Sequence, residues 1–199
     1  CIARLGVGFM FAPAHHSAMK HAIGPRREMA IRTLFNILGP LTNPAGAPHQ
    51  VLGVFSPQWQ LPMAQVLQRL GSKHVMVVHS EDGLDEISIA APTHVVELKH
   101  GEITEYTIDP ADYNVSHANL DALVVDDAIG SLKLIKQAFA GESGAPLDML
   151  LLNAGAAIYS ADLAVDLAAG IEQARIAISS GGARQKLDDL IQYTQGLNA

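Results

Sequence analysis

The apolar and polar positions between residues 51 and 78 predict a strand, a helix and a second strand in succession. Residues 51–55 form a short apolar, partly β-branched run, and apolar side chains recur at near-helical spacing from Trp59 to Leu70 before Gly71 ends the pattern. Residues 75–78, Val-Met-Val-Val, are typical of a buried strand. A strand–helix–strand unit requires parallel strands with a right-handed crossover, and its ligand sites usually lie at the carboxyl ends of the strands.

The pattern changes after this unit. Thr93 to Leu98 and Ile103 to Ile108 alternate with the period of two expected for strands, and residues 99–102 between them predict a β-hairpin turn. Apolar residues at three- and four-residue spacing then predict four helices, at 128–139, 147–159, 163–178 and 183–193. The sequence therefore predicts a single α/β domain over residues 1–199, with a mixed, largely parallel sheet flanked by helices.

Composition excludes several classes of protein. The chain of 199 residues is 49% hydrophobic and 17% charged, which suits a packed core, and its net charge of −7 argues against nucleic acid as a partner. The longest apolar stretches are far shorter than the ~20 residues of a membrane-spanning helix. The single cysteine, Cys1, cannot form an internal disulfide, so we expect a reducing, cytoplasmic location. The first residues do not resemble a signal peptide, and because the chain opens on Cys1 without an initiator Met, we interpret it as a fragment.

Two segments near the start of the chain contain candidate ligand-binding residues. His15, His16 and His21 do not share a helical face, and no carboxylate completes a ligand set, so substrate contact or ordinary hydrogen bonding is favoured over metal binding. Arg26 could form a bidentate pair with a carboxylate ligand, or lie on a solvated helix end. Residues 33–45 contain Gly-Pro and Asn-Pro pairs, which predict two turns close together.

A third segment, residues 81–87, is acidic and follows the strand at 75–78. Neighbouring carboxylates in such a loop can hold a hard cation such as Mg²⁺ while leaving coordination positions for water and substrate phosphate. An acidic surface turn is the equally weighted alternative.

Together these segments resemble the anthranilate phosphoribosyltransferase family. The resemblance is carried by Gly-Phe-Met-Phe-Ala-Pro-Ala-His-His at 8–16, Phe-Asn-Ile-Leu-Gly-Pro-Leu-Thr-Asn-Pro at 35–44, Asp-Gly-Leu-Asp-Glu at 82–86 and Leu-Leu-Asn-Ala at 151–154. It implies the catalytic-domain fold of nucleoside phosphorylases and phosphoribosyltransferases. It also implies transfer of the 5-phosphoribosyl group from phosphoribosyl pyrophosphate (PRPP) to the amino nitrogen of anthranilate, with Mg²⁺ bound.

The resemblance also implies roles for individual residues. The arginine that binds the anthranilate carboxylate falls on Arg26, the substrate-side histidine on His16, an acceptor-contacting position on Met19, and the tight turn of the acceptor tunnel on Gly39. Ser17 departs from the family, which commonly has proline there, so the loop is expected to be less rigid.

The family's magnesium pair falls on Asp85 and Glu86. Departure of pyrophosphate leaves positive charge on the ribosyl ring, so positioning and charge neutralisation supply most of the catalysis. No residue is assigned as a catalytic acid or base, because the amine of anthranilate is already an uncharged nucleophile near neutral pH.

Two glycine-rich loops of the family, Gly-Thr-Gly-Gly-Asp and Lys-His-Gly-Asn, are absent from these 199 residues. Lys99-His100-Gly101 is followed by Glu102 and lies between two predicted strands, so it is interpreted as a hairpin turn. The helical domain through which relatives dimerise would also lie upstream. We therefore expect the full-length enzyme to be a homodimer and residues 1–199 alone to be inactive.

Three alternatives remain open at this point. One is a nucleoside phosphorylase of the same superfamily, which would not need Arg26 together with residues 36–44. Another is a non-catalytic nucleic-acid-binding relative, against which the charge of −7 counts. The third is a folded C-terminal domain that has no activity of its own.

Overall fold

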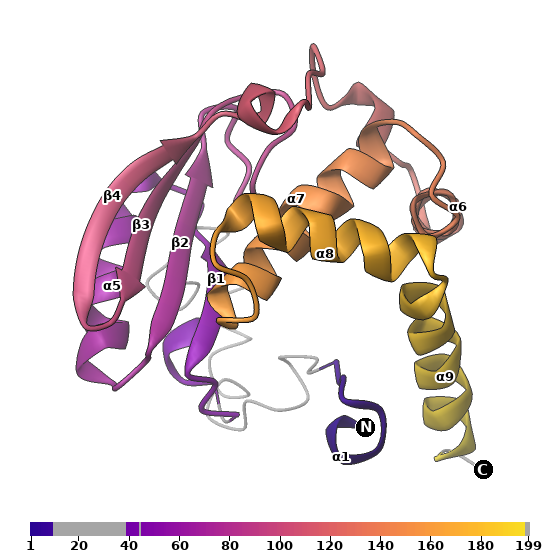
Figure 1. Cartoon of the computed structure of the whole chain (residues 1–199), viewed down its shortest axis with the longest axis horizontal. Helices are drawn as coiled ribbons and strands as arrows, with labels where there is room; N and C mark the ends of the chain where they lie inside the picture. The colour runs from indigo at the N-terminus through magenta and orange to yellow at the C-terminus, as the bar shows by residue number, and fades with distance from the viewer. Residues whose placement is uncertain (10–38, 44, 198–199) are drawn as a thin grey trace, which may run out of the picture. The chain divides into compact units, whose positions relative to one another are not determined.

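The computed structural model describes residues 1–9, 39–43 and 45–197, and these divide into two units (Figure 1). One unit comprises residues 1–46 and 185–199, and the other comprises residues 47–184. The first unit contains the short helix α1 (Ile2–Leu5) and most of α9 (Gly182–Gly196). The two helices are in contact, because the guanidinium of Arg4 lies 5.6 Å from the centre of the Tyr193 ring. No helix in the described ranges is long and apolar enough to cross a membrane.

The second unit contains a four-stranded sheet in the order β1-β2-β3-β4. Its strands are β1 (His49–Gly53), β2 (His74–Ser80), β3 (Thr93–Lys99) and β4 (Glu102–Ile108). β1 and β2 are parallel and are joined by the short 3₁₀ turn η2 (Pro57–Trp59) and the helix α5 (Gln60–Arg69), which confirms the predicted strand–helix–strand unit. The α/β class with a mixed sheet is confirmed as well.

Parallel pairing is less extensive among the described strands than the sequence analysis predicted. β2–β3 and β3–β4 are both antiparallel. The reason lies in the connections, because a parallel neighbour needs a long crossover, usually a helix, and residues 81–92 between β2 and β3 contain none. The connection between β3 and β4 is a two-residue turn at His100 and Gly101, with φ of 51° and 82°. Positive φ at both positions defines a type I′ hairpin turn, so this segment is the turn that the sequence predicts.

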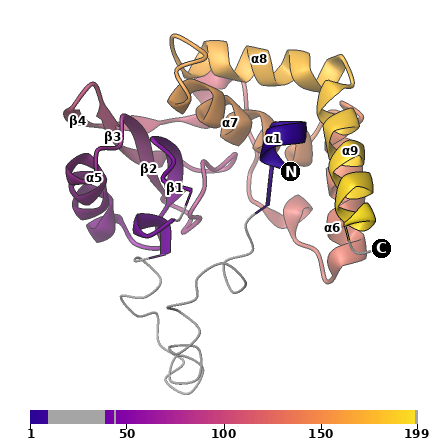
Figure 2. The ribbon, with the colours of Figure 1, turned by 90° about the horizontal axis from the view of Figure 1, so that it is seen from below.

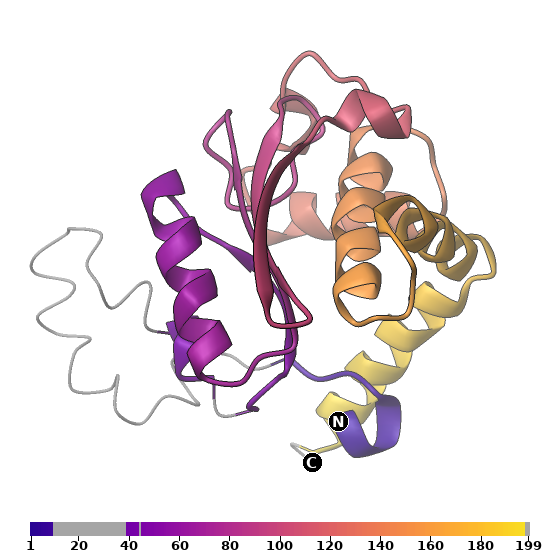
Figure 3. The same ribbon diagram turned by 60° about the vertical axis from the view of Figure 1, so that its left-hand side comes forward.

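Helices cover both faces of the sheet (Figure 3). α5 packs against one face, and α7 (Ala145–Ser160) packs against β1 and β2 from the other, with α8 (Leu167–Ser179) lying across α7 (Figure 2). Residues 110–139 contribute η3 (Pro110–Tyr113), η4 (Asp121–Leu123) and α6 (Ala128–Phe139). All four predicted helices are present. α8 begins at Leu167 and not at 163, because the carboxylate of Asp166 accepts a hydrogen bond from the Ala169 amide (2.8 Å) and caps the helix there.

The main core lies between the sheet and α7. Its fully buried side chains come from β2, the loop after it, β3 and α7, and include Met76, Val78, Ile87, Ile89, Val95, Leu151 and Leu152. Two glycines allow α8 to approach α7 backbone to backbone. A Cβ on Gly155 would lie 2.5 Å from Ile171 Cγ1 and 2.8 Å from its backbone nitrogen, and a Cβ on Gly170 would overlap the carbonyl oxygen of Gly155.

Replacing Gly170 by alanine is expected to destabilise the protein by about 1–3 kcal/mol, because the obstacle is backbone that cannot rotate away. The free energy of unfolding, measured by denaturant titration, checks this. Gly196→Ala is the matched control, since no atom lies within 4 Å of the added Cβ, and it should change stability by less than about 0.5 kcal/mol. Equal stabilities for the two variants would show that α7 and α8 are not packed this closely.

Candidate functional site

The acidic loop, residues 81–86, leaves the carboxyl end of β2. Its conformation is fixed by backbone hydrogen bonds from Ser80 to Leu84 (2.9 Å) and from Glu81 to Pro92 (3.0 Å), and Gly83 supplies a φ of 91° that L-residues rarely adopt. Asp85 and Glu86 are exposed to solvent. The loop is therefore a defined turn that presents two neighbouring carboxylates, at the strand end where the sequence predicted a ligand site.

The third acid of the motif, Asp82, points back into the loop. Its carboxylate accepts hydrogen bonds from the Ser88 hydroxyl (2.5 Å) and the Leu84 amide (3.3 Å). Desolvation raises the pKa of Asp82, but hydrogen bonds from Ser88, Ser80 and the Leu84 amide outweigh it, so that the pKa is lowered. The ionised Asp82 therefore stabilises the loop, and the exposed carboxylates of Asp85 and Glu86 are the candidate cation ligands.

Residues 87–89, immediately after the pair, anchor the loop in the protein. Ile87, Ser88 and Ile89 are fully buried. The side chain of Asn153, on α7, binds the backbone of Ile87 twice, accepting from its amide (3.0 Å) and donating to its carbonyl (2.9 Å). Asn153 thus fixes the position of the residue next to Glu86. The sequence contained a signal for it, because Asn153 is a polar residue inside an otherwise apolar helical run.

The two hydrogen bonds between the Asn153 side chain and the Ile87 backbone form a clamp, and removing it should loosen the acidic loop. In Asn153→Ala the amide and carbonyl of Ile87 lose their partners, so we expect a loss of about 1–3 kcal/mol in stability and a several-fold rise in the Mg²⁺ concentration needed for half-maximal activity of the full-length enzyme. Asn119→Ala is the control, because Asn119 caps only a local turn at the Asp121 amide. A Mg²⁺ requirement that Asn153→Ala leaves unchanged would show that the clamp does not position the carboxylates.

Gly53, the last residue of β1, determines where the loop rests. A Cβ at this position would overlap the backbone carbonyl of Asp85, so only glycine lets the loop pass directly over the end of the strand. The Asp85 backbone therefore lies against the end of β1, whereas the loop that contains it follows the end of β2. Asp85 and Glu86 are thereby placed above the carboxyl ends of the two parallel strands, the usual ligand position in α/β proteins.

The charges of this pair suit a cation. Partial desolvation raises the pKa of Glu86, and repulsion from the Asp85 charge raises it further. A divalent cation between or beside the two groups would remove that repulsion. Their oxygens are the hard ligands that Mg²⁺ prefers, and two carboxylates leave the remaining octahedral positions to water and to phosphate oxygens of a substrate. The residues present therefore fit a magnesium ion shared with a phosphorylated ligand.

The structure describes only one of the other four site residues named from the sequence. His16, Met19 and Arg26 lie outside the described residues, and their roles stay predictions. Gly39 belongs to the first unit, where its carbonyl accepts hydrogen bonds from the amide (3.2 Å) and hydroxyl (3.4 Å) of Thr42. Residues 39–41 are helical, and a turn follows that is closed by a bond from the Gly46 amide to the Asn43 carbonyl (3.0 Å), so a turn is confirmed near Asn43.

The sheet, the flanking helices and the acidic loop at the strand ends define an α/β domain with a candidate ligand site at the carboxyl ends of its parallel strands. Residues 1–184 match the family model described as "Glycosyl transferase family, a/b domain", and the chain belongs to that family. Within it, the chain is similar to anthranilate phosphoribosyltransferases. It is 61% identical to that of Thioalkalivibrio sulfidiphilus over 194 residues, which cover 98% of this chain and 57% of the relative. It is also 61% identical to the anthranilate phosphoribosyltransferase of Stutzerimonas stutzeri, over 96% of this chain and 56% of that relative.

Solved structures lead to the same family. The crystal structure of anthranilate phosphoribosyltransferase from Thermus thermophilus is 40% identical, with a TM-score of 0.86 over 96% of this chain and 56% of that one. The Saccharomyces cerevisiae enzyme in complex with PRPP and Mg shares the fold, with a TM-score of 0.83. It is 24% identical, and the match covers 94% of this chain and 54% of that one. The chain thus spans little more than half the length of the relatives that it matches.

Proposed function

We propose that the full-length protein transfers the 5-phosphoribosyl group from PRPP to the amino group of anthranilate, giving N-(5-phosphoribosyl)anthranilate and pyrophosphate in tryptophan biosynthesis. The observation that carries this proposal is the 61% identity to anthranilate phosphoribosyltransferases along nearly the whole of this chain. The geometry of the acidic loop supports it, because a reaction that expels a diphosphate needs a cation site at the end of the sheet where such substrates bind.

On the donor side, Asp85 and Glu86 would hold Mg²⁺, which when bound neutralises charge on the diphosphate of PRPP. Asn153, Gly53 and Asp82 keep the two carboxylates in place before the ion arrives. Because the loop is already braced, little conformational entropy is lost on binding, and the carboxylates meet the substrate in a fixed geometry. The same arrangement lets the leaving group depart without a protein acid.

On the acceptor side, Arg26 would bind the carboxylate of anthranilate, with His16 and Met19 beside the substrate and Gly39 on the turn that lines its path. A guanidinium presents two parallel donors that match a carboxylate, which selects an aromatic acid over a neutral aromatic amine. No acid or base need act on the amine. These four assignments rest on the resemblance to the family: His16 and Gly39 lie within the matching stretches at 8–16 and 35–44, and Met19 and Arg26 lie between those stretches.

Two further parts of the proposal concern the whole protein. We propose that it acts in the cytoplasm, in keeping with its single cysteine, and that it is a homodimer formed through an upstream helical domain. The yeast enzyme crystallised with PRPP and Mg supports Mg²⁺ as the metal.

The proposal is tested by following the fluorescence of anthranilate as purified full-length enzyme consumes it with PRPP and Mg²⁺. Consumption that needs all three components, with equimolar pyrophosphate released, is the expected result. A parallel reaction with a pyrimidine nucleoside and inorganic phosphate tests the phosphorylase alternative. Phosphorolysis without anthranilate consumption would overturn the proposal. Residues 1–199 alone should be inactive, because they contain no glycine-rich anion site for the pyrophosphate.

A further inference from the structure

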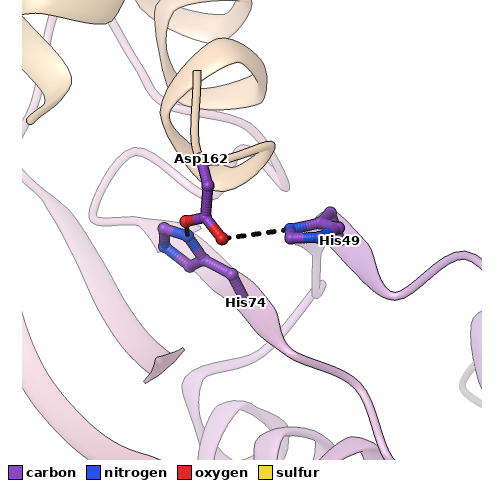
Figure 4. Close-up of side chains that lie close together, drawn as sticks. All are labelled: His49, His74 and Asp162. Atoms are coloured by element: carbon purple, nitrogen blue, oxygen red, sulfur yellow. Dashed lines mark hydrogen bonds and ion pairs between the residues drawn. The ribbon is translucent and has the colours of Figure 1, made fainter. Parts of the chain in front are cut away.

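A second cluster of possible metal ligands lies at the opposite ends of β1 and β2 from the acidic loop. His49 and His74 are the first residues of these two parallel strands and are paired in register. Asp162 follows the end of α7 and has a φ of 58°. Figure 4 shows the three side chains directed toward one another from three separate elements, and this is the one such group of histidine and acidic ligands found within the described part of the chain.

The spacing of the ligand atoms is already close to that of a coordination site. His74 Nδ1 lies 2.7 Å from one carboxylate oxygen of Asp162, and His49 Nδ1 lies 3.8 Å from the other. All three ligand atoms fall within 4.8 Å of one another. His49 Nδ1 also lies 2.7 Å from the Ser160 carbonyl, a bond that it would exchange for the metal.

The buried side of the cluster resembles the outer shell of a metal site. His74 Nε2 lies 2.7 Å from Glu97 Oε1, and the two side chains are only 1% and 8% exposed. The Tyr159 ring meets the imidazole edge-on at 4.8 Å, which fixes the ring plane. A carboxylate behind a histidine that ligates a metal sets its tautomer and increases its basicity.

The arrangement leaves His74 Nδ1 facing a negative group. If Nε2–H donates to Glu97, the neutral ring presents a lone pair at Nδ1 toward the Asp162 oxygen, and two acceptors then face each other. At 2.7 Å this contact is a hydrogen bond that contains a proton, and a metal ion would replace that proton once the two atoms separate to about 3.3 Å. Since Asp162 is 46% exposed and His49 27% exposed, an ion has access from solvent.

We propose that His49, His74 and Asp162 bind a divalent transition-metal ion such as Zn²⁺, with Glu97 as the partner of His74 behind the site. Two imidazole nitrogens and one carboxylate suit zinc better than magnesium, which prefers oxygen ligands. Bonds of about 2.0–2.2 Å at tetrahedral angles place ligand atoms about 3.3 Å apart. The exposed Asp162 would therefore move away from His74, the ligand atoms that lie up to 4.8 Å apart would approach one another, and solvent would supply the fourth ligand.

Zinc titration of the metal-free full-length protein by calorimetry tests the proposal, with the absorption spectrum of bound Co²⁺ reporting tetrahedral geometry. Asp162→Asn tolerates the positive φ and His49→Gln keeps the side chain polar, so both variants should fold. Each is expected to weaken Zn²⁺ binding at least about tenfold, and Glu97→Gln about 10- to 100-fold. His117→Ala, which breaks a His–Asp pair of 2.8 Å with no third possible ligand among the described residues, should leave binding unchanged.

Two results would overturn the proposal. One is a wild-type protein that binds neither Zn²⁺ nor Co²⁺. The cluster would then only be a set of hydrogen bonds that connects the two strands to the loop between α7 and α8. If the double variant Asp162→Asn/His49→Gln binds Zn²⁺ as tightly as the wild type, the ion lies elsewhere, for example on His15, His16 and His21.

Discussion

Replacing Asp85 by Asn and Glu86 by Gln in the full-length enzyme is expected to lower kcat/KM for PRPP by at least about 100-fold at moderate Mg²⁺. Both changes keep the size and polarity of the side chains but remove the negative charges that would hold the cation. The pair is exposed and the loop is braced by Asp82, Ile87 and Asn153, so the fold should survive. Steady-state kinetics over a Mg²⁺ titration should show a raised Mg²⁺ requirement as well as the lower rate.

Glu142→Gln with Asp188→Asn is the matched control, because it removes one Glu and one Asp charge from exposed positions outside residues 81–86. The control should keep wild-type kinetics. If the Asp85/Glu86 double variant also kept wild-type rates at every Mg²⁺ concentration, the loop would be an ordinary acidic turn.

Arg26→Ala should raise KM for anthranilate by about 10- to 150-fold, since a hydrogen bond to a charged group contributes about 1.5–3 kcal/mol. The KM for PRPP should change little, because the diphosphate is held on the donor side. Arg26→Lys should recover only part of the loss, because an ammonium cannot form the two parallel bonds of a guanidinium. Kinetics with each substrate varied in turn separate these effects.

Arg69, exposed in the last turn of α5, offers a control of the same residue type. Arg69→Ala should leave both Michaelis constants unchanged. An Arg26→Ala enzyme with an ordinary KM for anthranilate would show that Arg26 is a surface charge and that another group recognises the carboxylate.

The local parts of the fold could be predicted because their signals are local. Periodicity alone located β1, α5 and β2, and the hairpin followed from two alternating runs separated by His100 and Gly101. The direction of the β2–β3 pair was harder to predict, because it depends on whether a connection contains a crossover helix.

The supports of the candidate site could not be predicted in the same way. Asn153 binds Ile87 across 66 positions in the chain, and Gly53 is needed only because the Asp85 carbonyl comes to rest on it. His74 meets Asp162 across 88 positions. Such contacts form only when the loop and α7 pack against the sheet, so the sequence marks Asn153 as a polar residue in an apolar helix but not the partner that it binds. Asp85 and Glu86 themselves could be named from their motif.

The most direct measurement is the affinity of the full-length enzyme for PRPP, determined by calorimetry at limiting and at saturating Mg²⁺, for the wild type and for Asp85→Asn/Glu86→Gln. In the wild type, Mg²⁺ is expected to tighten PRPP binding at least about tenfold, because the two carboxylates hold the ion against the diphosphate. In the double variant this Mg²⁺-dependent gain in PRPP affinity should largely vanish. At limiting Mg²⁺ the variant should bind PRPP as tightly as the wild type or more tightly, because two negative charges that repel the diphosphate are gone. The same Mg²⁺-dependent gain in both proteins would contradict the assignment of Asp85 and Glu86 as the metal site.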